Sequence, residues 1–593
     1  MFDKLKPLYP YLRRYWKQLA WGGVSVLVYN ALKVMIPIAI GQAVDDLKHG
    51  VTQERILFHA LRVLGLAAAM AVFLYIMRQV IIGVSREIEF DLRNDLFANL
   101  ERQSASFYQT HRTGDIMART TNDLSAVRQL LGPAIMYSAQ TIVFTAAALP
   151  LMIRISPRLT LFAFVPLPIA SLVVQQFAAK IHKRFERIQA MFSDISAKAQ
   201  ENFSGARLIR AFAQEDAEIA SFETANLEYI DRSLHLVRLM AMLWPTLEFM
   251  LGLALMITLL VGGHEVVEGH ITSGQLAEYF VYMVQLTFPM IAVGWVVNLF
   301  QRGTASVIRI DELLKQQPSI VDDSSLSLSF RSEAEESASA SRSISGDIEF
   351  RNLTFAYESG PTVLHDINLD IPAGSSLAIV GPTGSGKSTL ISLIPRLYDA
   401  APGTVLIDGD PIRCWPLDDL RNQIGVVPQE TFLFSDTIEH NVSFGAPNAT
   451  QQQVEDAASI AHIRNEILEF PKGFGTGVGE RGITLSGGQK QRTAIARAVI
   501  RNPRILILDD ALASVDTFTE EQILSGLKQV MQGRTTIFIS HRISTARNAD
   551  QIAVLVEGRI AERGTHDELL NRGGYYTRLY EKQQLEEELA VAQ

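Results

Sequence analysis

The chain has 593 residues, too many for one domain, and 48% of them are hydrophobic. Its net charge of −9 at pH 7 argues against nucleic acid as a partner, since a nucleic-acid-binding protein carries a basic face. Cys414 is the only cysteine, which excludes a disulfide framework and a cysteine-based metal site. The apolar residues are concentrated in residues 1–300, whereas residues 346–583 have the composition of an ordinary soluble α/β domain.

The N-terminal segment mixes basic and aromatic residues. Its bases alternate with Tyr9, Tyr11, Tyr15 and Trp16. Aromatic side chains of this kind gather at the headgroup level of a bilayer. The segment therefore predicts a helix that lies in the membrane interface.

Six apolar stretches are each close to the length of about 20 residues that crosses a bilayer as a helix. We expect membrane spans at roughly 18–44, 57–85, 129–153, 159–181, 239–264 and 276–301. The loops at 86–128 and 180–238 are long and basic, whereas 265–277 contains glutamates and no lysine or arginine. By the positive-inside rule, both termini and the C-terminal domain face the cytoplasm of a multi-pass protein in the inner or plasma membrane.

Single charges stand inside three of the apolar cores, at Lys33, Arg78 and Glu248. A charge at that depth is costly unless it is paired or faces water. Two interpretations stay open. Lys33 and Glu248 line a transport cavity and favour polar or charged substrates, or they pair with each other while Arg78 reaches the interface.

Proline residues interrupt several of these spans and are expected to kink them, as suits a bundle that opens alternately to each side. They are Pro166, Pro168, Pro245 and Pro289.

A serine-rich segment, 316–346, has almost nothing to bury and predicts a flexible linker. A linker controlled by phosphorylation is the alternative.

A phosphate-binding loop follows the linker and one apolar strand. "GPTGSGKST" comes directly after "SLAIV" and directly before a helical pattern, which is the strand–loop–helix context that this motif requires. Gly384 and Gly386 let the backbone amides curl around phosphate oxygens, Lys387 neutralises the β- and γ-phosphates, and Ser388 provides a hydroxyl for magnesium.

Five further motifs accompany this loop. "FAY" precedes it, and "VVPQE", "LSGGQKQR", "ILILDD" and "IFISHR" follow it. With these motifs the chain resembles an ATP-binding cassette (ABC) exporter half-transporter over its full length. The resemblance implies a six-span α-helical transmembrane domain, 1–315, fused to a P-loop α/β ABC nucleotide-binding domain, 347–583, with a tail at 584–593.

The resemblance also implies the ligands and their residues. ATP and Mg²⁺ are the expected cofactors, with Ser388, Gln429 and Asp509 at the metal. The expected catalytic residues are Asp510, His541 and Gln429. The expected nucleotide-binding residues are Tyr357 on adenine, the loop Gly381, Pro382, Thr383, Gly384, Ser385, Gly386, Lys387, Ser388 and Thr389, the signature Ser486, Gly487, Gly488 and Gln489, and the interface residue Asp516. In this family the signature contacts the ATP held by a second, homologous half-transporter.

Asp510 stands where the family carries a glutamate that acts as general base. Aspartate is shorter by roughly 1.5 Å, one C–C bond, and a misplacement near 1 Å can cost about 100-fold in rate. The residue therefore resembles the slow site of a heterodimeric exporter whose other subunit hydrolyses ATP. A homodimer with an adapted aspartate base is the alternative.

Two cytoplasmic segments match the family's coupling helices. We expect the first at 112–123 and the second at 213–226. The expected cargo is a small amphipathic compound, such as a drug, lipid or peptide. A siderophore-type importer and a nearly non-hydrolysing regulatory subunit are the remaining alternatives.

Overall fold

The computed structural model describes residues 2–48, 52–322, 343–358, 360–513 and 517–591. The chain divides into two compact units. The helical unit comprises Met1–Asn99 and Gly114–Gln316, and the α/β unit comprises Leu100–Thr113 and Gln317–Gln593.

The helical unit contains seven principal elements: α2 (Trp16–Lys48), α3 (Gln53–Glu101), α7 (Ile135–Ile155), α8 (Pro157–Ala163), α9 (Pro166–Ser204), α11 (Glu215–Val267) and α12 (Ser273–Lys315). Shorter elements connect or precede them: η1 (Phe2–Leu8), α1 (Tyr9–Arg14), α5 (Thr113–Ala118), η2 (Arg119–Asp123), α6 (Leu124–Gln129), η3 (Leu130–Ala134) and α10 (Ala206–Ala211).

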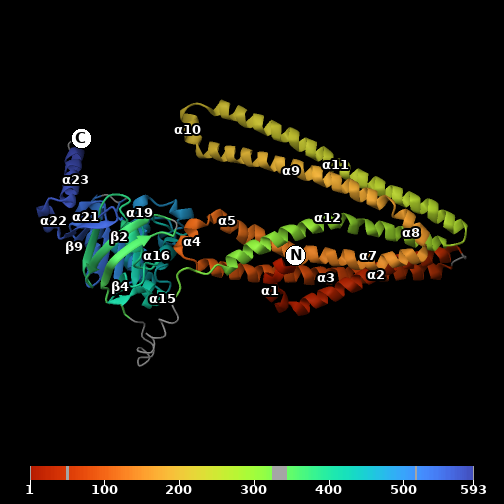
Figure 1. The fold of residues 1–593 in the computed structure, drawn as a ribbon, viewed down its shortest axis with the longest axis horizontal. Helices are drawn as coiled ribbons and strands as arrows, with labels where there is room; N and C mark the ends of the chain where they lie inside the picture. Colours follow the sequence, from red (N-terminus) through yellow and green to blue (C-terminus); the bar gives the residue numbers. More distant parts are fainter. Residues whose placement is uncertain (1, 49–51, 323–342, 359, 514–516, 592–593) are drawn as a thin grey trace, which may run out of the picture. The chain divides into compact units, whose positions relative to one another are not determined.

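Two groups of helices pack within this unit. Helix α2 packs against α12 and α7, where the Tyr282 hydroxyl donates to the Val34 carbonyl at 2.9 Å beside the buried ring of Phe144. Helices α9 and α11 lie side by side and are joined through α10 (Figure 1). Both helices carry exposed apolar side chains, such as Phe185 on α9 and Leu227 on α11.

Four of the helical segments in the described residues are long and apolar enough to cross a membrane: Trp16–Lys48, Gln53–Glu101, Thr113–Ile155 and Glu215–Val267. The predicted spans at 159–181 and 276–301 fall on α8, α9 and α12, and several side chains of α9 and α12 lie outside the described set. The predicted span at 159–181 is not one helix. It breaks after Ala163, and α9 begins at Pro166, whose ring has no N–H to continue the preceding helix.

The N-terminal aromatic residues divide between two environments. The Tyr11 hydroxyl donates to Asp95 at 2.6 Å and the Tyr15 hydroxyl donates to Asp91 at 3.0 Å, so these two side chains bind α3. Tyr9 and Trp16 are exposed. The segment is thus held against the helical unit by one set of aromatic residues while another set faces outward.

Lys33 lies over the ring of Phe144, with its Nζ 4.0 Å from the ring centroid. Among the described residues no ion pair joins Lys33 to Glu248, whose side chain is exposed. Of the two interpretations left open by the sequence, the structure therefore does not show the Lys33–Glu248 pair, and Lys33 instead makes a cation–π contact.

The described residues of the α/β unit form ten strands: β1 (Ile348–Ala356), β2 (Thr362–Ile371), β3 (Ser376–Val380), β4 (Val405–Ile407), β5 (Asp410–Pro411), β6 (Ile424–Val427), β7 (Ile505–Asp509), β8 (Thr535–Ile539), β9 (Gln551–Val556) and β10 (Arg559–Gly564). Its helices are α4 (Ala105–Thr110), α14 (Lys387–Ser392), α15 (Leu417–Asn422), α16 (Ile438–Ser443), α17 (Gln451–Ile460), α18 (Arg464–Glu469), α19 (Gly487–Val499), α20 (Thr517–Met531), α21 (Ile543–Ala546), α22 (His566–Arg572) and α23 (Tyr575–Val591), with short turns η4 (Ile412–Cys414), η5 (Gly473–Gly475) and η6 (Glu480–Gly482).

A six-stranded sheet in the order β10-β9-β3-β8-β7-β6 organises this unit, and strands β9 to β6 run parallel. Strand β7 is buried along its whole length. Leu506 and Leu508 face one hydrophobic core, whereas Ile505 and Ile507 face the other. Burial on both faces explains why its sequence is continuously apolar and does not alternate.

Three segments differ from the predicted domain ranges. Leu100–Thr113, which contains helix α4, belongs to the α/β unit, whereas most of the predicted coupling segment 112–123 lies in the helical unit. The start of the predicted linker is hydrogen-bonded to the rest of the α/β unit. Leu417 donates its N–H to Asp322 at 2.9 Å, and Arg396 donates to the Val321 carbonyl. Residues 323–342 lie outside the described residues. Residues 584–591 of the predicted tail form the end of α23, and residues 592–593 lie outside the described residues.

Asp408 fixes the entry into β1. Its carboxylate accepts from the N–H groups of Ser345, Gly346 and Asp347 at 2.7, 3.0 and 2.9 Å. Its own backbone has a φ of 52°, a conformation that aspartate tolerates better than most residues. One side chain thus satisfies three backbone donors at the end of the linker.

We expect Asp408→Ala to lower the thermal unfolding temperature by the equivalent of about 3 kcal/mol, because it removes the acceptor of three backbone N–H groups, one of them on the buried Gly346, and puts alanine in a left-handed conformation. Asp408→Asn keeps one acceptor oxygen and should lose less. Differential scanning fluorimetry of the full chain measures both, with the exposed Asp418→Ala as control. Equal melting temperatures for Asp408→Ala and the control would contradict this role.

Candidate functional site

The parallel sheet brings the predicted site residues to one edge. Strand β3 ends before Gly381, β6 ends two residues before Gln429, β7 ends at Asp509, and β8 ends two residues before His541. Since β3, β8, β7 and β6 are neighbours and run parallel, their carboxyl ends meet at the same edge. Segments up to about 160 residues apart in the chain are therefore neighbours in the fold.

The phosphate-binding loop has the backbone that its glycines allow. Gly384 and Gly386 have φ values of 81° and 97°, in the left-handed region. At Gly386 a β-carbon would approach the Leu364 side chain to 2.8 Å, and at Gly381 it would approach the Leu555 carbonyl oxygen to 2.0 Å. Glycine is required at both positions by the space as well as by the backbone.

Lys387 is held inside the loop. Its Nζ donates to the carbonyls of Gly381 and Pro382, both at 2.9 Å, and its side chain is buried. Burial lowers the pKa of Lys387, and the nearby carboxylates of Asp509 and Asp510 oppose that shift. A buried ammonium with two carbonyl partners and a third N–H in reserve is suited to an anion such as a phosphate.

Ser388 and Asp509 form a polar pair at the base of the loop. The Ser388 hydroxyl donates to Asp509 Oδ1 at 3.1 Å. Burial raises the pKa of Asp509, partly opposed by this hydrogen bond. A hydroxyl beside a buried carboxylate is a donor set that a hard cation such as Mg²⁺ prefers. The buried Ser385 hydroxyl lacks a hydrogen-bond partner among the described residues, as expected of a loop shaped around an absent anion.

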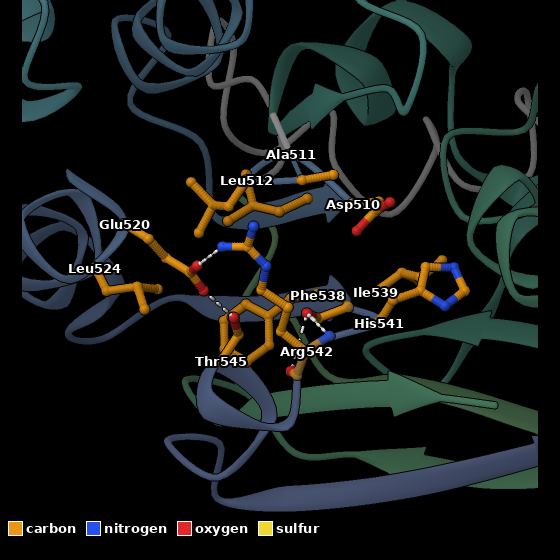
Figure 2. Close-up of a pocket in the computed structure, with 13 residues that line it drawn as sticks. Asp510, Ala511, Leu512, Glu520, Leu524, Phe538, Ile539, His541, Arg542 and Thr545 are labelled. Atoms are coloured by element: carbon orange, nitrogen blue, oxygen red, sulfur yellow. Dashed lines mark hydrogen bonds and ion pairs between the residues drawn. The ribbon is translucent and has the colours of Figure 1, made fainter. Parts of the chain in front are cut away.

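Asp510 and His541 line one cavity of about 240 Å³. In the close-up they lie on one side of it, with Glu520 and Leu524 on the other (Figure 2). The Asp510 backbone is fixed at both ends. Its N–H donates to the Ile539 carbonyl at 3.0 Å, and its carbonyl accepts from Ala513 at 3.2 Å, with a φ of 48°.

The opposite wall of the cavity is a buried ionic cluster. Glu520 on α20 is 3% exposed and accepts from the guanidinium of Arg542 and the hydroxyl of Thr545 (Figure 2). Both partners follow His541 in the chain, Arg542 directly and Thr545 four residues later. The cluster holds the segment after β8 against α20.

Tyr357 contacts the loop through its hydroxyl, which shares a hydrogen bond of 2.9 Å with Thr389. Its ring meets the ring of Tyr398 edge-on, with centroids 5.1 Å apart. The Tyr398 hydroxyl accepts from Gln109 of α4 at 2.6 Å. The predicted adenine-binding tyrosine is thus connected by side-chain contacts to α4.

The signature residues form the start of α19. The Ser486 hydroxyl accepts from the Gln489 N–H at 3.2 Å, and the Gln489 side chain accepts from the Ser486 N–H at 2.9 Å. This reciprocal capping leaves Gly487 and Gly488 in the first turn. Gln489 also donates to Glu466 at 3.0 Å, so its side chain both caps the helix and contacts α18.

Two predicted site residues stand apart from these contacts. Gln429 is exposed, two residues beyond the end of β6. Asp516 lies outside the described residues. The signature residues do not line the cavity that holds Asp510 and His541.

Comparisons with known proteins place this geometry in a family. Residues 19–290 match the family model of the ABC transporter transmembrane region, and residues 364–513 match the ABC transporter model. The chain is 38% identical to the multidrug resistance-like ATP-binding protein MdlA of Escherichia coli (strain K12), over 97% of this chain and 96% of that protein. The chain belongs to the ABC transporter family.

Two other similar proteins cover nearly the whole of this ABC transporter. An ATP-dependent lipid A-core flippase of Syntrophus aciditrophicus (strain SB) is 35% identical over 98% of this chain and 94% of that protein. The solved structure of a bacterial Atm1-family ABC exporter with ATP bound has a TM-score of 0.76 and 29% identity, covering 96% of this chain and 98% of that one. The predicted family and fold class are confirmed. The ABC transporter binds ATP and couples its hydrolysis to transport, and proteins of this architecture act as dimers in the membrane.

Sequence reasoning missed the residues that support this ABC transporter's site, Glu520, Arg542 and Tyr398. For Glu520 a signal exists. Ile523, Leu527 and Val530 form the buried stripe of α20, and Glu520 continues that stripe one turn earlier. A carboxylate in an apolar stripe needs a buried partner, which predicts an ion pair.

We expect Asp509→Asn to raise the melting temperature of the nucleotide-free transporter at neutral pH. Because burial raises the pKa of Asp509, the folded chain holds this proton more tightly than the unfolded chain does. The charged carboxylate therefore costs stability increasingly as the pH rises from the ordinary value of 3.8 through the folded pKa, and asparagine lacks that cost.

The same substitution should reduce magnesium-dependent ATP turnover by about 100-fold or more, because the carboxylate that suits the cation is lost. Scanning fluorimetry across pH and a phosphate-release assay measure the two effects. A melting temperature below that of the unchanged chain at neutral pH would contradict the stability argument.

Proposed function

We propose that this chain is one half of a dimeric ABC exporter that uses ATP to move small amphipathic compounds, such as drugs, lipids or peptides, out across the inner or plasma membrane. One observation carries the proposal. Lys387 is held inside the phosphate-binding loop and Ser388 donates to Asp509 at the edge of a parallel sheet, in a chain that also contains helices long and apolar enough to cross a membrane. Relatives named as a multidrug resistance-like protein and a lipid A-core flippase support this choice of cargo.

The orientation follows from the basic cytoplasmic loops, with both termini and the α/β unit in the cytoplasm, where ATP is available. ATP phosphates bind in the loop Gly381–Thr389, where Lys387 supplies charge and the backbone amides supply hydrogen bonds. Ser388, Asp509 and Gln429 would hold Mg²⁺, which neutralises charge on the phosphates when it is bound. Tyr357 supports the adenine ring, and its contact with Tyr398 holds its ring in place.

Hydrolysis needs a base for the attacking water and a partner for the γ-phosphate. Asp510 orients the water, and His541 contacts the γ-phosphate. Their position on one cavity supports these roles. The signature Ser486, Gly487 and Gly488 lies apart from this cavity, which supports the proposal that it completes the ATP site of a second half-transporter, with Asp516 at the interface.

The site of this chain is the slower of two in a heterodimer. Aspartate is shorter than glutamate by roughly one C–C bond, 1.5 Å. The backbone of Asp510 is tied to Ile539 on one side and to Ala513 on the other, so the strand cannot move forward to make up that length. A homodimer in which the water sits closer to the aspartate is the second candidate.

We expect the purified chain alone to hydrolyse MgATP slowly, and Asp510→Glu to raise its turnover by about tenfold or more, since a base displaced by about 1 Å can cost about 100-fold. Lys387→Ala serves as the inactive control. Turnover is measured by phosphate release. Turnover that falls in Asp510→Glu would establish the aspartate as an adapted base and favour the homodimer.

We expect inverted membrane vesicles that contain the transporter and its homologous partner to accumulate a fluorescent amphipathic dye when MgATP is added. The cytoplasmic face is outside in such vesicles, so export appears as uptake. Vesicles with Lys387→Ala in this chain should accumulate less, because this site cannot hold the phosphates productively. ATP-driven loss of preloaded dye would indicate import.

A further inference from the structure

The backbone around His541 is held by a residue far along the chain. Gln583 of α23 donates from its side-chain nitrogen to the His541 carbonyl. Its side-chain oxygen accepts from the Ile543 N–H at 2.9 Å. Ile543 begins α21, and an N–H in the first turn of a helix has no partner within the helix. One amide side chain therefore satisfies a donor and an acceptor on either side of Arg542.

Helix α23 is anchored well enough to act as a fixed support. Glu562 accepts from the N–H groups of Tyr575 and Tyr576 at its first turn. Tyr576 is fully buried and its hydroxyl shares a hydrogen bond of 2.8 Å with His566. Leu579 packs on the same core.

Gln583 stands on the face of α23 that packs on the α/β unit. Positions 576, 579, 580 and 583 share one side of the helix by the spacing i, i+3, i+4 and i+7. The apolar part of this face ends at Tyr580, and the next position on it is the polar Gln583. A glutamine there continues the docking surface of the helix onto the segment that carries His541.

Side chains other than Gln583 also hold this segment. Glu520 accepts from Arg542 and Thr545, and the Ser540 hydroxyl accepts from the Arg542 N–H at 2.9 Å. The His541 side chain itself is exposed and lines the same cavity as Asp510. The backbone is thus held by several contacts while the imidazole stays available to a ligand.

We infer that Gln583 is a positioning residue for His541, through which the C-terminal helix α23 sets the direction of the imidazole at the γ-phosphate. The inference rests on the proposed role of His541 in hydrolysis. It makes α23 part of the ATPase machinery through its contact with the segment that contains His541. Loss of the Gln583 contacts would slow turnover without weakening the hold of the loop on ATP.

The first test measures the hydrogen bond from the Ile543 N–H to Gln583 directly and does not depend on ATP turnover. Hydrogen–deuterium exchange of the full-length transporter follows the peptide that contains Ile543, in the unchanged chain and in Gln583→Leu. The matched control is Gln584→Leu, the exposed neighbour, whose amide donates to Tyr580. We expect exchange at Ile543 to rise about tenfold in Gln583→Leu only, since its donor is freed. Equal exchange in all three proteins would overturn the inference.

The second test measures the consequence for hydrolysis in the Asp510→Glu background, where turnover is expected to be measurable. Gln583→Leu should lower kcat about tenfold with little change in the KM for ATP, and it should have no further effect when His541→Ala is also present. A fall of the same size on the His541→Ala background, or a change in KM alone, would overturn the positioning role.

A third variant separates positioning from folding. Gln583→Glu keeps the oxygen that accepts from Ile543 but replaces the donor to the His541 carbonyl with a second acceptor. It should preserve slow exchange at Ile543 and still lower kcat. If no variant in the Asp510→Glu background hydrolyses ATP faster than Lys387→Ala, the proposed function fails. The exchange measurement still shows whether Gln583 holds the segment that contains His541.

Discussion

The parallel pairing of β3, β8, β7 and β6 is the constraint on which the nucleotide site depends. Backbone hydrogen bonds between Asp509 and its neighbours place the ends of these strands level, with Asp509 opposite Ile539 and Leu508 opposite Val427. The central strands β3, β7 and β8 are buried along their whole length, so a shift in register would expose apolar residues and leave backbone groups unpaired. Because the strands are fixed in this register, Asp510 after β7 and His541 after β8 line the same cavity.

Charge at this edge has a cost that a ligand can offset. Burial lowers the pKa of Lys387 and raises that of Asp509, so both charged forms are disfavoured without ligand. Phosphate and a divalent cation reverse both penalties by supplying the opposite charges. The site is therefore less stable when empty than a neutral one would be, and this strain favours binding. The same opposition between stability and function is common at active sites.

The support for the site comes from outside the nucleotide motifs. Glu520 and Gln583 both hold the segment that contains His541, and Tyr398 connects Tyr357 with Gln109 of α4. The backbone of His541 is held by these contacts while its side chain is exposed. A fixed backbone under an exposed ligand-binding side chain suits a site that must alternately bind ATP and release products.

The sequence by itself determined the fold class, the family and the local motifs, because these depend on short patterns: apolar length for spans, glycine spacing for Gly384 and Gly386, and a continuous apolar strand before Asp509. Only the tertiary structure decided which distant residues meet. It placed 100–113 with the α/β unit, broke the span at Pro166, put Gln489 into a helix cap and brought Gln583 to His541. Contacts between residues 42 positions or more apart depend on how helices dock, and docking depends on the summed packing of many side chains, which local patterns do not contain.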